Sequence, residues 1–284
     1  MTSSSNQLPP LDIPWILRQA EIKPSRGLGQ NFLNDDSILS RIVEAGEVSS
    51  ADTVLEIGPG LGSLTRHLAN AARVVTAVEI DRKIFPLLQK ILQPFANIHL
   101  VCGDILEQRL DQLDLPPGYL VVANIPYYIT SAVIRYLLEA PVKPARIVLT
   151  VQHEVAQRIC ALSGDLNLLA LSVQVYGAPR VMMRIPSGAF YPPPKVDSAV
   201  VRIDLYSHSL IPTSDLDLFF RLCKAGFGQK RKTLRNSLSG GMHLPSAVVE
   251  NRLKQAGIDP MRRAETLSLD DWQKLVDNWK VNGI

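Results

Sequence analysis

The chain has 284 residues, of which 46% are hydrophobic, and its net charge is only +3. That length suits one sizeable domain with a smaller second one, and the apolar content is enough for a large core. Three widely spaced cysteines without a C-x-x-C pair, and five histidines without metal-ligand spacing, argue against a disulfide framework or a zinc site, so we expect no metal.

The N-terminal residues 1–10 are rich in Ser and Pro, carry no charge and lack the basic and apolar regions of a signal peptide. Such a composition is typical of disorder. We predict a flexible tail over residues 1–22 and a cytoplasmic protein. The most apolar stretch, Tyr119 to Leu138, is interrupted by Asn124, Pro126 and Arg135, which favours a buried strand and a helix over a membrane span.

A short buried strand is predicted over Val54 to Ile57, followed by the glycine loop Gly58-Pro59-Gly60-Leu61-Gly62 and a helix from about Ser63 to Asn70. Glycines allow positive φ and close approach of the backbone, and the helix start offers unpaired N–H groups. The dinucleotide-binding pattern needs a third glycine where this chain has Ser63. The segment therefore predicts a nucleotide cradle of another kind.

Three more polar residues each close an apolar, strand-like run: Glu79 after Val74–Val78, Asp104 after Ile98–Gly103, and Asn124 after Tyr119–Ala123. Ligands in open α/β sheets bind outside the carboxyl ends of the strands. The Glu79 carboxylate can accept hydrogen bonds from two ribose hydroxyls, and that of Asp104 from an adenine amino group. Asp104 alone could mark a solvated turn, but its register with Glu79 and Asn124 favours a ligand site.

The tetrapeptide Asn124-Ile125-Pro126-Tyr127 is suited to hold a planar amine. Pro126 fixes its own φ and removes a donor, so the Asn124 side-chain oxygen and the Ile125 carbonyl can both accept from one NH2 group. Tyr127 can stack on the ring. Alone, the tetrapeptide could equally be a turn; the glycine loop upstream favours the binding role.

Further strands are predicted at Arg146–Gln152, Leu171–Tyr176 and Ala199–Leu205, which gives the α/β alternation of a mostly parallel seven-stranded sheet. Before the last of them, Phe190 and Tyr191 open a proline run, itself typical of a stiff connector. An exposed aromatic pair at a loop start needs a stacking partner. We therefore predict that Phe190 is the second wall of an adenine slot, opposite Tyr127.

After Leu205 the strand pattern stops, and helices are predicted from Ser214-Asp215, after Pro245 and after Ser268. This indicates a boundary near residue 208. From Arg221 to Ile284 the chain has twelve Lys or Arg against six Asp or Glu, a charge of +6. Such an excess is usually a solvated helix face. Beside an adenine-holding motif it favours RNA phosphate contacts by the cluster Lys230, Arg231, Lys232 and Arg235.

These segments resemble a known family. The G-x-G-x-G loop, with Glu56 two residues before it, is similar to the S-adenosylmethionine loop of class I methyltransferases. The resemblance to ribosomal RNA adenine dimethyltransferases runs from about Lys23 to Leu275 and rests on six segments: Gly29–Leu33, Glu56–Thr65, Val78–Asp81, Gly103-Asp104, Asn124–Tyr127 and Phe190–Ser198. In the C-terminal half, residues 227–238 and 257–265 look like the bacterial small-subunit branch.

The resemblance implies a Rossmann-like class I methyltransferase domain over residues 23–208 and a small all-helical, RNA- and ribosome-binding domain over 209–284. It implies dimethylation at N6 of two adjacent adenosines of 16S rRNA, in a small-subunit precursor, by a monomer. The implied cofactor, S-adenosylmethionine, would be bound by Asn31, Leu33, Gly58, Gly60, Glu79, Asp104 and Asn124. Asn124, Tyr127 and Phe190 would act in catalysis.

Two rival functions remain at this stage. A DNA adenine or protein glutamine methyltransferase usually has N-P-P-Y, and Ile125 with the helical C-terminal region argues against it. A non-catalytic ribosome-assembly factor would use the cofactor only structurally, and intact Asn124, Tyr127 and Phe190 disfavour that role.

Overall fold

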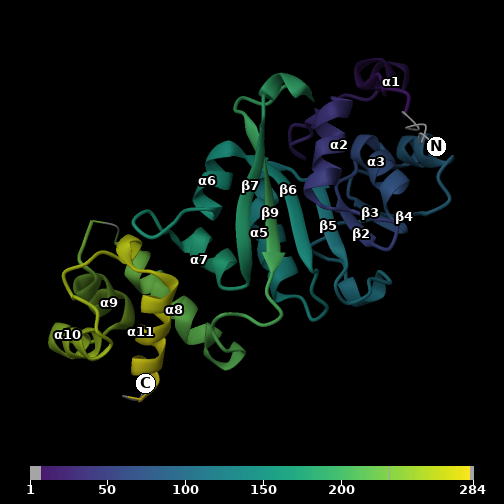
Figure 1. The fold of residues 1–284 in the computed structure, drawn as a ribbon. Coiled ribbons are helices and arrows are strands. Elements are labelled where there is room, and N and C mark those ends of the chain that lie inside the picture. Colours follow the sequence, from purple (N-terminus) through teal and green to yellow (C-terminus); the bar gives the residue numbers. More distant parts are fainter. Residues whose placement is uncertain (1–7, 230, 282–284) are drawn as a thin grey trace, which may run out of the picture. The chain divides into compact units, whose positions relative to one another are not determined.

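The computed structural model describes residues 8–229 and 231–281, which form two compact units. The first unit comprises the chain up to Ala156 together with Arg180–Leu205. The second comprises Gln157–Pro179 and the chain from Tyr206 onward. Figure 1 labels the elements of both units.

The main sheet has seven strands in the order β4 (Ile98–Cys102), β3 (Val74–Glu79), β2 (Thr53–Ile57), β5 (Leu120–Asn124), β6 (Arg146–Gln152), β9 (Ser198–Leu205) and β7 (Gly177–Ile185). Neighbours from β4 to β6 pair in parallel, whereas β9 runs antiparallel to β6. The predicted α/β fold with a mostly parallel seven-stranded sheet is confirmed. Because parallel strands end at one edge, β2, β3, β4 and β5 bring their carboxyl ends together.

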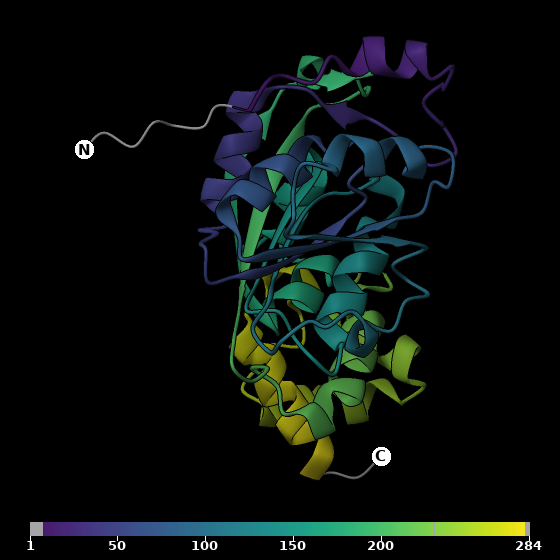
Figure 2. The same ribbon diagram turned by 90° about the vertical axis from the view of Figure 1, so that its right-hand side faces the viewer.

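Helices cover the sheet on both sides (Figure 2). On one face, α2 (Asp36–Ala45) and α3 (Ser63–Ala71) bury Ile42 and Leu68 against alternate residues of the strands, such as Val54 and Val122. Such alternation follows from the two-residue period of a strand. Further helices of this region include α4 (Phe85–Leu92), α5 (Thr130–Glu139) and the start of α6 (His153–Ile159).

The strand predicted at Leu171–Tyr176 is wrong, because this segment belongs to helix α7 (Leu168–Gln174). The Asn167 side chain caps the helix by accepting from the Ala170 N–H at 3.0 Å. The alternation of apolar and polar residues in this segment is typical of a half-buried strand, but it is too short to exclude a helix. The sixth strand is β7, which contains Pro179 and lies at the end of the sheet order, where a missing N–H is tolerated.

The stretch predicted to be a flexible tail, residues 1–22, contains helix α1 (Ile13–Gln19). Asp12 caps it by accepting from the Trp15 N–H at 2.9 Å. Ile13 and Leu17, four residues apart and so on one helix face, are buried in a cluster with Phe32. The flexible-tail prediction is therefore wrong for this helix, and residues 1–7 lie outside the described part.

The second unit is helical and contains α7, α8 (Leu216–Phe227), α9 (Leu234–Met242), α10 (Ser246–Gln255) and α11 (Leu269–Val281). Its core includes the fully buried Phe219, Leu238 and Trp272. The break after Leu205 lies close to residue 208, but the unit also takes in Gln157–Pro179, which the predicted first domain included. Within residues 8–229 and 231–281, no helix combines the length and apolarity needed to cross a bilayer.

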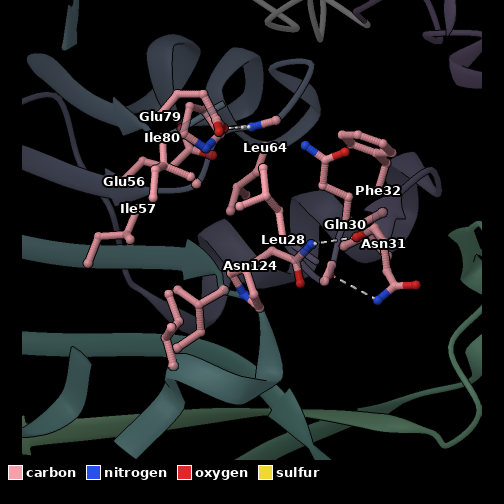
Figure 3. A pocket seen from close by; sticks show the side chains of 18 of the residues that line it. Leu28, Gln30, Asn31, Phe32, Glu56, Ile57, Leu64, Glu79, Ile80 and Asn124 are labelled. Atoms are coloured by element: carbon pink, nitrogen blue, oxygen red, sulfur yellow. Dashed lines mark hydrogen bonds between the residues drawn. The ribbon is translucent and has the colours of Figure 1, made fainter. Parts of the chain in front are cut away.

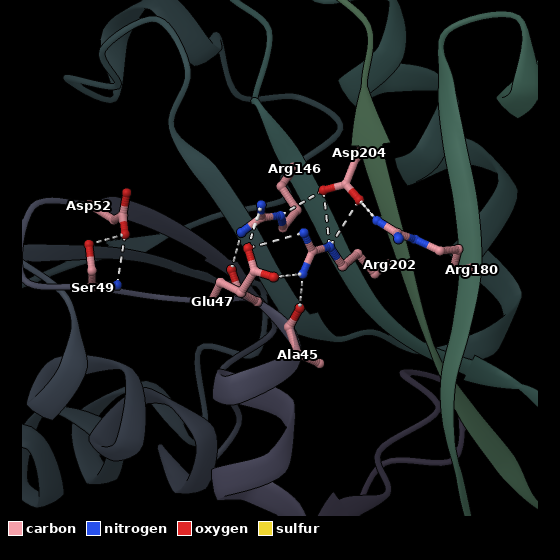
Figure 4. Close-up of polar contacts among 9 residues, drawn as sticks. Ala45, Glu47, Ser49, Asp52, Arg146, Arg180, Arg202 and Asp204 are labelled. Atoms are coloured by element: carbon pink, nitrogen blue, oxygen red, sulfur yellow. Dashed lines mark hydrogen bonds and ion pairs between the residues drawn. The ribbon is translucent and has the colours of Figure 1, made fainter.

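Five charged residues form an arginine clasp at the C-terminal end of α2: Glu47, Arg146, Arg180, Arg202 and Asp204 (Figure 4). Arg146 and Arg202 donate to the Gly46 and Ala45 carbonyls at 2.7 and 3.1 Å, so they cap the carbonyls that a helix end leaves unpaired. Burial alone would raise the pKa of Asp204, but hydrogen bonds from the three arginines outweigh it and lower that pKa. The clasp thereby fastens α2 to β6 and β9.

Candidate active site

A pocket opens at the carboxyl ends of β2 to β5, and its lining comes from the first unit. All nine predicted site residues line it: Asn31, Leu33, Gly58, Gly60, Glu79, Asp104, Asn124, Tyr127 and Phe190. Figure 3 shows part of this lining, with Asn31 and Asn124 on one side and Glu79 on another. Among the residues that the structure describes, no cluster of three or more His, Cys, Asp or Glu side chains is arranged to bind a metal.

The glycine loop approaches the N-terminal segment closely. Gly58 and Gly60 have φ of +69° and +61°, where a side chain would strain the backbone. A Cβ atom on Gly60 would lie 3.0 Å from the Phe32 ring. The loop thus presents bare backbone to the pocket, and a side chain at either glycine would occupy space that a ligand needs.

Glu79 lies at the end of β3 and is only 4% exposed. Its two carboxylate oxygens accept from the Gly60 N–H at 2.9 Å and from the Asp81 N–H at 2.8 Å. Burial raises the pKa of Glu79, although these backbone donors counteract it. The carboxylate therefore ties the glycine loop to the end of β3.

A hydrogen-bond chain links this carboxylate to the N-terminal segment. The Gln30 side-chain amide donates to the Asp81 carboxylate at 2.7 Å. Asp81 in turn donates its N–H to Glu79. Sequence reasoning gave no role to Gln30 or Asp81, because their contact joins residues that are far apart along the chain.

Glu56 is a second buried carboxyl in the pocket wall, 1% exposed, and sequence reasoning used it only as a motif position. Its Oε2 atom has no hydrogen-bond partner within residues 8–229 and 231–281. Burial raises the pKa of Glu56 to about 8, and the charge of Glu79 acts in the same direction. An unpaired buried carboxyl is costly, and a cationic ligand in the pocket would relieve that cost.

Two of the predicted residues are held by hydrogen bonds to the backbone, one local and one between distant segments. One Asp104 oxygen accepts from the Leu106 N–H at 2.9 Å. The Asn124 side-chain amide donates to the Asn31 carbonyl at 3.3 Å (Figure 3). This bond uses the Asn124 nitrogen and leaves the Oδ1 atom as an acceptor, as holding an amine requires.

Tyr127 is half-buried and its hydroxyl is 2.6 Å from the Ser198 hydroxyl, which fixes the ring. Phe190 differs from expectation. It is only 4% exposed and packs in the core with Leu33, its partner in the short sheet of β1 (Phe32–Leu33) and β8 (Phe190–Tyr191). Its exposure was predicted wrongly because a local proline-rich pattern cannot reveal this long-range pairing, yet the residue still lines the pocket.

The basic cluster lies in the second unit. Arg231 and Lys232 are exposed, whereas Lys230 lies outside the described residues. Arg235 forms an ion pair with Glu250 at 2.9 Å, so its charge is already shared.

The sheet, the glycine cradle and the two buried carboxyls at strand ends define an S-adenosylmethionine-dependent class I methyltransferase. Acceptor groups and an unpaired carboxyl oxygen fit a ligand that carries ribose hydroxyls, an ammonium group and a sulfonium centre.

The chain belongs to the ribosomal RNA adenine dimethylase family, whose model matches residues 22–280. It is 46% identical to a Ribosomal RNA small subunit methyltransferase A of Dehalococcoides mccartyi, over 92% of this chain and 93% of that protein. Among solved structures, the 23S rRNA methyltransferase ErmE is 30% identical with a TM-score of 0.72, over 88% of this chain and 100% of its own. A dimethyladenosine transferase from Plasmodium falciparum is 26% identical with a TM-score of 0.76, over 89% and 98%.

We expect Glu79→Ala to weaken S-adenosylmethionine binding roughly 10- to 100-fold, since hydrogen bonds to a charged group are removed, without unfolding the protein. Isothermal titration calorimetry measures the affinity, and circular dichroism verifies the fold. Glu79→Gln retains one acceptor oxygen and should bind with intermediate affinity. Unchanged affinity in a folded Glu79→Ala protein would remove this residue from the cofactor site.

Proposed function

We propose that this protein transfers methyl groups from S-adenosylmethionine to N6 of two adjacent adenosines in the 3′-terminal hairpin loop of 16S rRNA, in a precursor of the small ribosomal subunit. The observation that carries the proposal is that the Asn124–Tyr127 segment and the glycine loop open into one pocket. The small-subunit substrate is supported by the 46% identity to the D. mccartyi protein, against 30% for the 23S enzyme. The protein acts in the cytoplasm as a monomer.

The cofactor is held by the strand ends. Glu79 accepts from the ribose hydroxyls, Asp104 from the adenine amino group, and the backbone of Gly58 and Gly60 lies against the ligand. Asn31 and Leu33 complete the wall. When bound, S-adenosylmethionine supplies a methyl group on a positively charged sulfur.

Asn124 aims the nucleophile. The lone pair of adenine N6 is delocalised into the ring, so the free amine is a poor nucleophile. In the first transfer, Oδ1 of Asn124 and the Ile125 carbonyl would accept the two N6 hydrogens, which favours a tetrahedral nitrogen whose lone pair points toward the methyl carbon. One of these hydrogens is lost as a proton when the methyl group is added, so a single hydrogen remains to hold the nitrogen in the second transfer. Such positioning contributes up to roughly 7–11 kcal/mol in the best-aligned systems.

Aromatic side chains hold the flipped base. Tyr127, fixed by Ser198, provides one face of the slot, and the buried Phe190 provides the other. Extruding a base costs a few kcal/mol, which stacking of about 1–3 kcal/mol per base offsets. An adenosine in a hairpin loop is already partly unstacked, so its extrusion costs less.

We assign methyl transfer to residues 23–208 and contacts with rRNA and the ribosome to residues 209–284. If Lys230, Arg231, Lys232 and Arg235 neutralise phosphates, changing all four to Gln should flatten the logarithmic dependence of binding on salt, by roughly 0.7 to 0.9 for each phosphate that is no longer neutralised. Affinity for small-subunit particles is measured by filter binding between low and moderate salt. The affinity for S-adenosylmethionine should stay the same.

Two further variants sharpen this measurement. Arg231→Gln with Lys232→Gln removes two exposed charges, whereas Lys224→Gln with Lys274→Gln removes two exposed lysines elsewhere in the second unit. Only the first pair should flatten the slope. Equal slopes for both pairs and the wild type would mean that the basic cluster is an ordinary solvated surface.

Mass spectrometry of 16S rRNA from a strain that lacks the gene tests the proposed function. Expression of the wild-type protein should restore two dimethyladenosines near the 3′ end, and expression of the Asn124→Ala variant should not. Methylation that returns in 23S rRNA instead would contradict the small-subunit assignment.

A further inference from the structure

Two adjacent tyrosines at the pocket have opposite environments. Tyr127 is half-buried and bonded to Ser198. Tyr128 follows it in the same short 3-10 helix, η2 (Tyr127–Ile129), and also lines the pocket, yet it is 62% exposed. No hydrogen bond to its hydroxyl occurs within residues 8–229 and 231–281. The fold therefore leaves most of this aromatic surface in water.

One edge of the Tyr128 ring lies near Gly29 of the N-terminal segment. A Cβ atom built on Gly29 would lie 3.4 Å from the ring and 3.3 Å from Cβ of Pro126. Gly29 has φ of +60°, a backbone conformation that favours glycine. The glycine thus leaves room beside one edge of the ring, and the rest of the ring stays exposed.

Tyr128 is close in the chain to Asn124, the proposed acceptor for the target amine, and both residues line the same pocket. Tyr128 follows Asn124 by four residues, and Thr130, where α5 begins, is buried and anchors the far end of the turn. A nucleic-acid base has an aromatic face whatever its identity, so an exposed aromatic ring serves as a stacking platform. When one base occupies the pocket, a neighbouring base of the strand has to remain at its mouth.

We propose that Tyr128 stacks on the unpaired base next to the adenosine in the pocket and thereby positions the RNA for transfer. The inference rests on the proposed function and extends it to a second nucleotide. In a substrate with two adjacent target adenosines, the adenosine that is not in the pocket is this stacking partner. Tyr128 is a positioning residue, since it does not contact the reacting nitrogen.

Steady-state kinetics with a hairpin RNA substrate test the proposal. Tyr128→Ala should raise KM for the RNA about 5- to 100-fold, as expected for removal of one stacked aromatic ring, and change kcat much less. Tyr128→Phe should restore KM, because the ring and not the hydroxyl makes the contact. Trp15→Ala is the matched control: Trp15 is 54% exposed in α1 and does not line the pocket, so KM should not change.

A binding measurement separates this inference from the proposed function. With 2-aminopurine next to the target position, stacking should quench its fluorescence in complexes of the wild type and Tyr128→Phe, but not of Tyr128→Ala. If the wild type fails to methylate the RNA while the quenching still depends on Tyr128, the proposed function is wrong and the stacking contact stands. Equal quenching by Tyr128→Ala and the wild type, or an unchanged KM, would overturn the inference.

Discussion

Asn124→Ala is expected to lower kcat for methyl transfer by at least about 1000-fold, while RNA binding falls by less than about 10-fold. A loss of this size in kcat is only a part of the barrier reduction that good positioning of reactants can supply. The substitution removes the Oδ1 acceptor that aims the adenine amine. It also removes the hydrogen bond to the Asn31 carbonyl. RNA binding is largely retained because phosphate contacts supply most of the affinity. Single-turnover kinetics with labelled cofactor measure the step directly.

The exposed Asn70 of α3 provides a matched control, since Asn70→Ala makes the same chemical change away from the pocket. Its turnover should equal that of the wild type. Phe190→Ala is tested alongside as a second single variant. If Asn124→Ala and Phe190→Ala both turned over at near wild-type rates, the adenine slot would be refuted and the assembly-factor role favoured.

Glu56→Gln is expected to stabilise the free protein at pH 8 by on the order of 5 kcal/mol, at about 1.4 kcal/mol per pKa unit. Burial raises the pKa of Glu56 in the folded state to about 8. As pH rises above the unfolded pKa of about 4.3, only the unfolded chain releases this proton, so the contribution of Glu56 to wild-type stability falls up to about pH 8 and then levels off. A glutamine has no proton to release, and the variant loses this decline.

Urea unfolding at pH 4, 6 and 8 measures the effect. The two proteins should be similarly stable at pH 4 and should diverge as pH rises. Glu154→Gln makes the same change on an exposed carboxyl of α6 and should show no such divergence. A constant difference between Glu56→Gln and the wild type at all three pH values would contradict the assigned protonation of Glu56.

The fold could be predicted where local pattern and tertiary context agree. The apolar runs that end at Glu79 and Asn124 are strands because each pairs in parallel with a strand on either side, inside the sheet. Leu171–Tyr176 alternates apolar and polar residues as a strand does, but the cap by Asn167 begins a helix there. Ile13 and Leu17 carry a short helical signal that composition alone obscured.

The candidate site could be predicted at the strand ends, because parallel strands bring distant polar residues to one edge. Contacts between distant loops could not be predicted in the same way. The Gln30 to Asp81 hydrogen bond and the burial of Phe190 depend on segments that meet only in three dimensions. Nor does the sequence show that Tyr127 is half-buried while Tyr128 is exposed, since the Tyr127 hydroxyl meets Ser198, a residue far away along the chain.

The pairing of β1 with β8 determines when the pocket can form during synthesis. Leu33 leaves the ribosome long before its partner Phe190, and at about 5–20 residues per second the delay is roughly 8–30 s. β2 to β6 are made during that interval, but one wall of the pocket is absent until Phe190 follows. A nascent chain therefore completes its cofactor site late. The completing contact joins residues far apart in the sequence, and such contacts form slowly.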